Sequence, residues 1–393
     1  MKHKITTLIL ILLISLKSVA QTSGLIDCLN SYSFDLFKEI KVTNDNVFLS
    51  PLCTYIALSI AYEGAASDTK HEFEKVLHIS DPVLHKDFIN YAKTLTNRLD
   101  LSNYLNVSNA LWIQNSFTID GSYLKTIRNQ YSAEIKSVDF RNKYKAISDI
   151  NQWISEKTEN RIKEMIQTND VDDLTRIIIS STIYFVTSWE DKFDKKLTKP
   201  DTFYSIDNIS DHTDFMNIKE SLEYFENDKF QFVSKDYQEY DKSFCIILPK
   251  ERYGINFIES ELNKDSFASI LKNTKSLEVN LSIPKFTLET NYELVEPLKR
   301  LGLIKAFSTN ADFSRITKTN TLNIDKVIHN AYIMIDEEKT EATASTVISH
   351  TLGYAGGIST DIKYFKADHP FIFMIIDNKT KGIIFIGRYV KPK

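Results

Sequence analysis

A stretch of small residues near the C-terminus is the part of the chain whose composition suggests chemistry. From Glu337 to Ser359 the sequence reads EEKTEATASTVISHTLGYAGGIS, with no proline, no charge after Glu341 and no aromatic residue before Tyr354. Runs rich in β-branched and aromatic residues flank it at 331–336 and 369–377. This composition predicts an exposed, soluble loop between two core strands. Its residue types are also compatible with a β-strand.

Alternate positions of this loop suit the buried face of a β-sheet. A strand that enters the middle of a sheet needs small or apolar side chains on one face and an N–H at every ladder position. The positions on that face are small or apolar and uncharged: Thr340, Ala342, Ala344, Thr346 and Ile348. Pairing about a dozen residues, at a net of about 1 kcal/mol per hydrogen bond, would release on the order of 10 kcal/mol, as much as the stability of an ordinary domain. The segment could therefore form a strand that is stable once it is buried.

The sequence contains no local signature of an enzyme active site. It has no G-x-S-x-G or G-x-x-x-x-G-K-[ST] motif, and the pair His71-Glu72 lacks the second histidine of H-E-x-x-H. The eight histidines show no ligand spacing, and Cys28, Cys53 and Cys245 lie too far apart for a zinc pair or a disulfide framework. We therefore expect no enzyme, no metal and no cofactor, although a triad assembled only in space would leave no such signature.

Periodic patterns predict the elements that must position the loop. Apolar residues spaced three and four apart predict helices at 32–40, 53–62, 69–77, 88–99, 123–131 and 147–162. Strand-like runs occupy 110–113, 135–140, 176–186, 244–248 and 277–288, and most of the chain from 323 onward. The patterns predict one α+β domain, with helices gathered in the first half and strands in the second.

The N-terminus has the features of an export signal. Two lysines precede an apolar run at 5–16, and Ser18-Val19-Ala20 fits the small-x-small cleavage pattern. We expect a signal peptide over 1–20 and a secreted, extracellular mature chain, periplasmic or at the cell surface in a bacterium. A net charge of −4 argues against nucleic acid or membranes as partners.

Six sequence blocks together resemble the serpins. They are NVFLSPLCTYIALSIAYEGA from Asn46, NALW at 109–112, IISSTIYFVTSWEDKF at 178–193, IPKFTLETNYELVEPLKRLGL at 283–303, AFSTNADFS at 306–314 and FKADHPFIFMI at 365–375. The resemblance covers about 25–393 and implies a single-domain α+β serpin fold over 21–393. That fold has three β-sheets, eight or nine α-helices and an exposed reactive-centre loop within 337–364. It also implies a monomer that inhibits a target protease by suicide, trapping the acyl-enzyme as the cleaved loop inserts into the central sheet.

The resemblance assigns a hinge at the start of the loop. It consists of Glu337, Glu338, Lys339, Thr340, Ala342, Ala344 and Thr346. The small residues are typical of inhibitory serpins, whereas Lys339 stands where those members have glycine. Inhibition is therefore expected, with a non-inhibitory carrier or chaperone serpin as the alternative.

Five further positions are implied by the same resemblance. Ser50, Ser181 and His329 match the shutter beneath the sheet, although Ser181 replaces the usual asparagine and should make a longer or water-mediated bond. Trp189 matches the tryptophan at the top of the sheet, where insertion begins. Glu337 and Lys285 match a pair that holds the base of the loop.

Two ways of counting place the reactive bond differently. Counting forward from Glu337 gives Gly353-Tyr354, and counting back from Phe365 gives Gly356-Gly357. No Arg or Lys occurs between 339 and 363, which argues against a trypsin-like target, because its pocket pairs a cation with a buried Asp. Leu352 and Tyr354 suit a chymotrypsin-like or cathepsin-like protease, and Gly353 or Ala355 suits an elastase-like one. A papain-like cysteine protease stays open as a target.

Four asparagines begin N-x-S/T triplets and would accept glycans in a eukaryotic secretory pathway. They are Asn106, Asn208, Asn280 and Asn378. In and beside the helix expected at 88–99, the basic residues Lys86, Lys93 and Arg98 alternate with Asp87 and Asp100, so a solvated face is expected there rather than a polysaccharide site.

Overall fold

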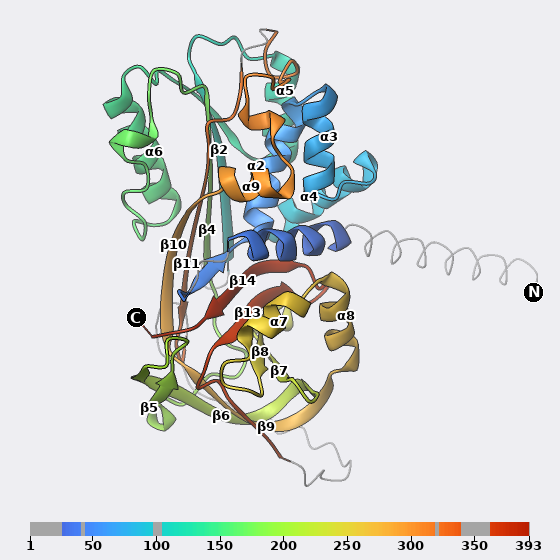
Figure 1. Cartoon of the computed structure of the whole chain (residues 1–393), viewed down its shortest axis with the longest axis vertical. Coiled ribbons are helices and arrows are strands. Elements are labelled where there is room, and N and C mark those ends of the chain that lie inside the picture. Colours follow the sequence, from blue (N-terminus) through green and yellow to red (C-terminus); the bar gives the residue numbers. More distant parts are fainter. Residues whose placement is uncertain (1–25, 41–43, 97–103, 319–321, 339–361, 393) are drawn as a thin grey trace, which may run out of the picture.

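The computed structural model describes residues 26–40, 44–96, 104–318, 322–338 and 362–392 (Figure 1). The predicted signal peptide, and the loop from Lys339 to Asp361, lie outside these residues. In the described part a long central sheet carries helices on both faces, and a second sheet with two short helices lies at one end.

The central sheet has five strands in the order β10-β11-β4-β2-β3. They span Phe286–Glu293, Lys326–Ile335, Ile177–Val186, Tyr104–Gln114 and Glu134–Val138. Every residue of β4 is buried. Ile177, Ile179 and Ile183 enter the main core and Ile178 enters a second core, so alternate side chains fill two cores and the strand is apolar almost throughout.

The second sheet has nine strands and is continuous through one long strand. The order is β1-β14-β13-β8-β7-β6-β9-β12, with β5 paired to β6. The strands span Val47–Leu49, Ile383–Tyr389, Phe371–Asp377, Lys242–Pro249, Phe230–Asp236, Ser210–Glu226, Lys275–Pro284, Lys363–Lys366 and, for β5, Lys199–Tyr204. The first part of β6 pairs with β5 and its last four residues pair with β7. Two of the three expected sheets are thus joined through β6, which pairs with β5 and β9 and, at its end, with β7.

Most of the helices precede β4, and three lie in the second half. A first helix covers 26–39. The others are α2 Pro51–Gly64, α3 Ser67–Val76, α4 Pro82–Thr96, α5 Gly121–Thr126 with a π-helical continuation Ile127–Tyr131, α6 Lys143–Lys157, α7 Ile255–Glu261, α8 Lys264–Asn273 and α9 Val295–Leu301. Helix α2 begins where it does because Ser50 accepts a hydrogen bond from the Cys53 N–H and Pro51 occupies the first turn.

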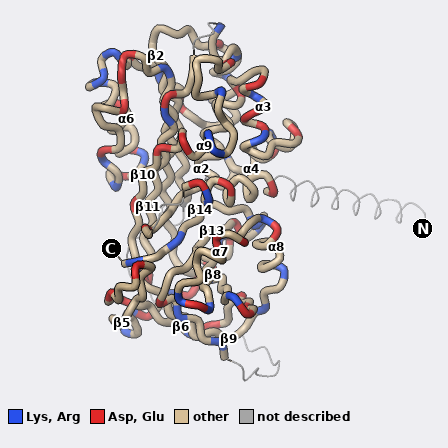
Figure 2. Tube along the Cα trace, in the orientation of Figure 1, with Lys and Arg blue, Asp and Glu red and all other residues tan. Residues whose placement is uncertain are grey.

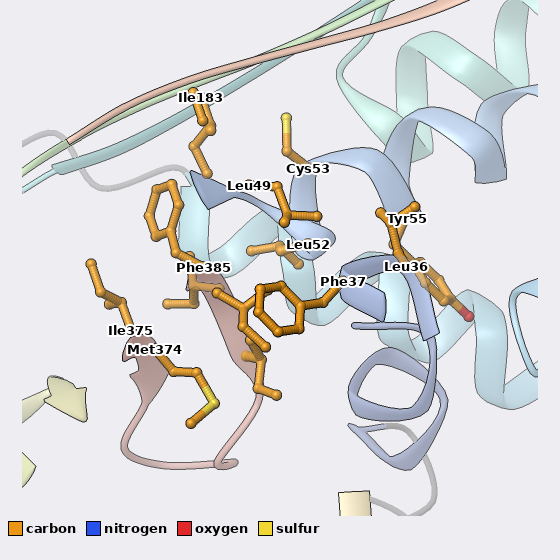
Figure 3. Close-up of a cluster of buried hydrophobic side chains, with 14 of the residues drawn as sticks. Leu36, Phe37, Leu49, Leu52, Cys53, Tyr55, Ile183, Met374, Ile375 and Phe385 are labelled. Atoms are coloured by element: carbon orange, nitrogen blue, oxygen red, sulfur yellow. The ribbon is translucent and has the colours of Figure 1, made fainter. Parts of the chain in front are cut away.

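Two hydrophobic cores lie on opposite faces of the central sheet. The larger core lies where the first helix, α2, β13 and β14 meet, with Phe37, Leu52, Met374 and Phe385 packed together (Figure 3). The smaller core lies under α6, where Trp153 meets Trp112 edge-on at 5.9 Å between ring centroids. Helix α6 therefore covers the face of the sheet opposite α2 (Figure 1).

The α+β class is confirmed, and one detail of the sequence prediction is wrong. The run at 277–288 is two strands, β9 and β10, which belong to different sheets and are separated by Lys285. The gathering of helices in the first half is confirmed among the described residues, where the first helix and α2 to α6 precede β4 while α7, α8 and α9 follow β8. Strand β6 was not predicted because its polar and apolar residues do not alternate cleanly. The burial of its residues changes along the strand, where its pairing partners change.

Candidate functional site at the parallel strand pair

The candidate site is the boundary between β4 and β11, two neighbouring parallel strands. Seven residue pairs join them, from Lys326 opposite Ile178 to Tyr332 opposite Tyr184. Strand β11 continues to Ile335 beyond the last pair. A segment that follows β11 and folds back between the two strands would run antiparallel to both, the more stable arrangement per residue.

Glu337 holds the base of the loop segment at the end of β11. Its carboxylate is buried and accepts hydrogen bonds from Lys285 Nζ at 2.9 and 3.2 Å and from the Thr198 hydroxyl at 2.8 Å. The Phe193 N–H donates to its backbone carbonyl at 3.1 Å. Burial raises the pKa of Glu337, but the bonds from Lys285 and Thr198 outweigh it and hold the pKa below its ordinary value. The charged form therefore fixes where the chain leaves the sheet.

Trp189 lies beside the same chain segment. Its indole N–H donates to the carbonyl of Asp336 at 2.7 Å, and its ring stacks on Tyr237 with centroids 4.6 Å apart. The buried ammonium of Lys235 lies 5.7 Å from the Trp189 ring and pairs with Glu220. These contacts pack the end of the sheet tightly around Asp336, where the chain leaves β11.

His329 links β11 to the start of α2. Its Nε2 accepts from the Ser50 N–H at 2.9 Å, and the Ser50 hydroxyl donates to the Ile384 carbonyl at 2.7 Å. Burial lowers the pKa of His329 to about 3, and the Ser181 backbone opposes this only in part. The imidazole is therefore neutral at physiological pH, with the proton on Nδ1.

Ser181 lies opposite His329 in the register, but its side chain bonds elsewhere. Its hydroxyl donates to Cys53 Sγ at 2.9 Å, and the Cys53 thiol donates to the Thr182 carbonyl at 3.2 Å. The expected side-chain bond to His329 is thus replaced by one to Cys53, whose burial raises its pKa to about 12. The structure brings the three predicted shutter residues together with this different bonding.

Sequence reasoning missed Asn330, which lies next to His329 in β11. Its side chain is completely buried, and neither amide atom has a hydrogen-bond partner among the described residues. Asn330 was visible as a polar residue within an otherwise apolar strand-like run, and that signal could have marked it.

Most of the predicted loop lies outside the described residues. Of the hinge, the structure describes Glu337 and Glu338, and the half-buried Glu338 carboxylate pairs with the exposed Lys195 at 3.1 Å. The hinge residues from Lys339 onward and all the candidate reactive-bond residues, Leu352 to Gly357, lie outside the described residues.

The four glycosylation candidates differ in accessibility. Asn208 is exposed in the turn between β5 and β6. The Asn106 amide donates to the Lys157 carbonyl at 3.3 Å, and the Asn378 amide donates to Asp236 at 3.0 Å. Asn280 lies within β9, opposite Lys219 of β6. Asn208 is the most accessible of the four.

Other kinds of site find little support in the part of the chain that is described. Among those residues, no group of three or more His, Cys, Asp or Glu is arranged to hold a metal ion, and no helix is long and apolar enough to cross a membrane. Acidic and basic residues are interspersed along the elements in the view of Figure 2.

The fold, with a parallel strand pair that leads into a small-residue segment held at a salt-bridged base, is that of a serpin-type domain. The family profile described as "Serpin (serine protease inhibitor)" matches residues 27–392. The chain therefore belongs to the serpin family.

Relatives and solved structures agree with this assignment. An uncharacterized serpin-like protein of Thermococcus kodakarensis is 35% identical, over 95% of this chain and 87% of the relative. A leukocyte elastase inhibitor of Xenopus laevis is 33% identical, over 92% of this chain and 97% of the relative. The crystal structure of the thermophilic serpin Tengpin in the native state is 30% identical and covers 93% of this chain and 94% of that one, with a TM-score of 0.84.

Proposed function

We propose that this protein is a secreted suicide inhibitor of an extracellular protease. The protease cleaves the loop that follows Glu338 at a bond between Leu352 and Gly357. The cleaved loop then inserts between β4 and β11 while still linked to the protease as an acyl-enzyme. The observation that carries the proposal is the parallel pair of β4 and β11, with the small-residue segment leaving directly from the end of β11.

The geometry supports insertion energetically. Opening the pair breaks one parallel ladder of seven residue pairs, and an inserted strand replaces it with two antiparallel ladders. The alternating small residues from Thr340 to Ile348 would give the inserted strand an uncharged inner face. The exchange therefore increases both strand pairing and apolar burial.

The target is inferred from the loop sequence and from relatives. We propose a chymotrypsin-like or elastase-like serine protease, because the loop offers Leu352, Gly353 and Tyr354 but no Arg or Lys. The relative described as a leukocyte elastase inhibitor supports the elastase-like choice. Secretion is proposed from the N-terminal signal pattern alone.

The test mixes the protein with chymotrypsin, an elastase, a papain-like protease and trypsin, followed by denaturing gels. We expect an SDS-stable complex with chymotrypsin or the elastase and none with trypsin. Complete cleavage by all four without any complex would contradict inhibition and would favour a non-inhibitory serpin.

A matched pair of variants tests the insertion step. Thr340→Arg would bury an unpaired charge on the inner face, at a cost of several kcal/mol in practice, so it should convert the inhibitor into a substrate cleaved at the same bond. Thr343→Arg makes the same change on the outer face and should keep the yield of complex. An undiminished yield from Thr340→Arg would show that this loop does not act by insertion.

A further inference from the structure

One side chain contacts both strands of the β4–β11 pair at the end where they would separate. Tyr184 and Tyr332 form the last residue pair of the ladder. The guanidinium of Arg161 lies 5.7 Å from the centroid of the Tyr332 ring. It also lies beside the Tyr184 hydroxyl, where it opposes the rise in the pKa of Tyr184 that burial causes. Arg161 therefore contacts a residue of β4 and a residue of β11 at once.

A defined turn after α6 delivers Arg161 to this position. Glu159 and Asn160 have φ values of 50° and 61°, a left-handed conformation that is uncommon for residues other than glycine. The Asn160 N–H donates to the Ser155 carbonyl at 2.8 Å, and the Ser155 hydroxyl donates to Asn160 Oδ1 at 3.0 Å. Arg161 in turn donates its N–H to the Thr158 carbonyl at 2.9 Å. These bonds make the turn part of the helix end.

The segment that follows Arg161 is also fastened to α6. Asn151 of α6 accepts from the N–H groups of Met165 and Ile166 and donates to the Ile166 carbonyl, each at 2.9 Å. Farther along, Asp170 pairs with Lys326 of β11 at 3.0 Å. The chain segment that carries Arg161 is therefore held in place both before and after this residue.

We propose that Arg161 is a latch that sets the rate at which β4 and β11 separate, an inference that rests on the proposed insertion. Once the strands part to admit a third strand, Tyr184 and Tyr332 are no longer neighbours, and one guanidinium cannot keep both contacts. At least one contact must break before the new strand can pass this level of the sheet. Arg161 therefore raises the free-energy barrier to insertion by holding β4 and β11 together.

The expected effect follows from the two contacts. A cation–π contact and a polar contact with a neutral hydroxyl are each of modest strength, so their joint loss should speed strand entry about tenfold, equivalent to about 1.4 kcal/mol. Arg161→Lys should fall between Arg161→Ala and the wild type, because lysine keeps the charge but lacks the planar fork.

The experiment uses the intact, uncleaved protein and a synthetic peptide with the sequence of residues 340–351. The rate of peptide annealing into the sheet is followed by native-gel mobility and by the rise in thermal midpoint. We expect Arg161→Ala to anneal the peptide about tenfold faster than the wild type. Lys163→Ala, which removes an exposed cation from the same segment, should anneal at the wild-type rate.

A double-mutant cycle separates the latch from a general loss of stability. In a Tyr184→Phe, Tyr332→Leu background, Arg161→Ala should give no further acceleration, whereas a purely structural effect would add to it. Annealing by the wild type at the same rate as Arg161→Ala would overturn the latch and leave insertion intact. If no protein accepts the peptide, insertion itself fails and the latch falls with it.

Discussion

Replacing Asn330 with leucine should stabilise the native protein. The Asn330 side chain is fully buried in β11, and among the described residues its amide oxygen and nitrogen have no hydrogen-bond partner. A buried polar group without a partner costs about 1 to 3 kcal/mol, and an apolar side chain of similar size removes that cost. Leucine has the same branched four-atom side-chain skeleton as asparagine, although its two methyl groups are bulkier than the planar amide, so it can occupy the same position with some repacking.

The expected size of the effect follows from that penalty. Because the two unpaired atoms belong to one amide, we expect the free energy of unfolding to rise by about 1 to 3 kcal/mol. At about 2 to 4 °C per kcal/mol, the thermal midpoint should rise by roughly 2 to 12 °C. The strand pair should also open more slowly, so the fraction of protease trapped should fall.

Calorimetry and urea unfolding of the intact protein measure this change. The control is Asn291→Leu, the same substitution at the exposed register partner of Asn330 in β10, which should change stability by no more than about 0.5 kcal/mol. A lower midpoint for Asn330→Leu would refute the reasoning, because the amide would then have a partner, such as an ordered water, that leucine cannot replace.

Three further predictions concern the loop, two of the buried histidines and the helix cap. Cleavage between Leu352 and Gly357 should raise the thermal midpoint by tens of degrees, since about 1 kcal/mol corresponds to about 2 to 4 °C; equal midpoints for cleaved and intact protein would exclude insertion. Burial lowers the pKa of His329 to about 3 and of His85 to about 4. The unfolded chain therefore binds more protons than the folded one, and stability should fall as the pH drops from about 6.5 toward 4, by up to about 1.4 kcal/mol per pH unit for each histidine. Urea midpoints at pH 7 and 5 test this, and a Gln variant of either residue should show a weaker pH dependence. Ser50→Ala removes both the α2 cap and the bond to Ile384, and should lower the free energy of unfolding by about 1 to 3 kcal/mol in urea titrations; an unchanged urea midpoint would contradict the cap assignment.

Several features could be predicted from the sequence because they depend on local patterns. The helix at α2 follows from its Ser50-Pro51 start and its apolar residues, and the apolar run of β4 follows from burial on both faces. The family resemblance placed Glu337 beside Lys285, and the structure brings the two together at 2.9 Å. The small-residue composition of the loop is likewise a property of the sequence alone.

Only the tertiary structure decided which side chains bond to one another. The Ser181 hydroxyl turns to Cys53, 128 positions away, and Arg161 reaches Tyr184 and Tyr332 on two different strands. Periodicity reports backbone geometry and burial, whereas a hydrogen-bond partner depends on how distant segments pack. For the same reason β9 and β10 read as one run in the sequence, because their separation at Lys285 is set by the two different sheets that they join.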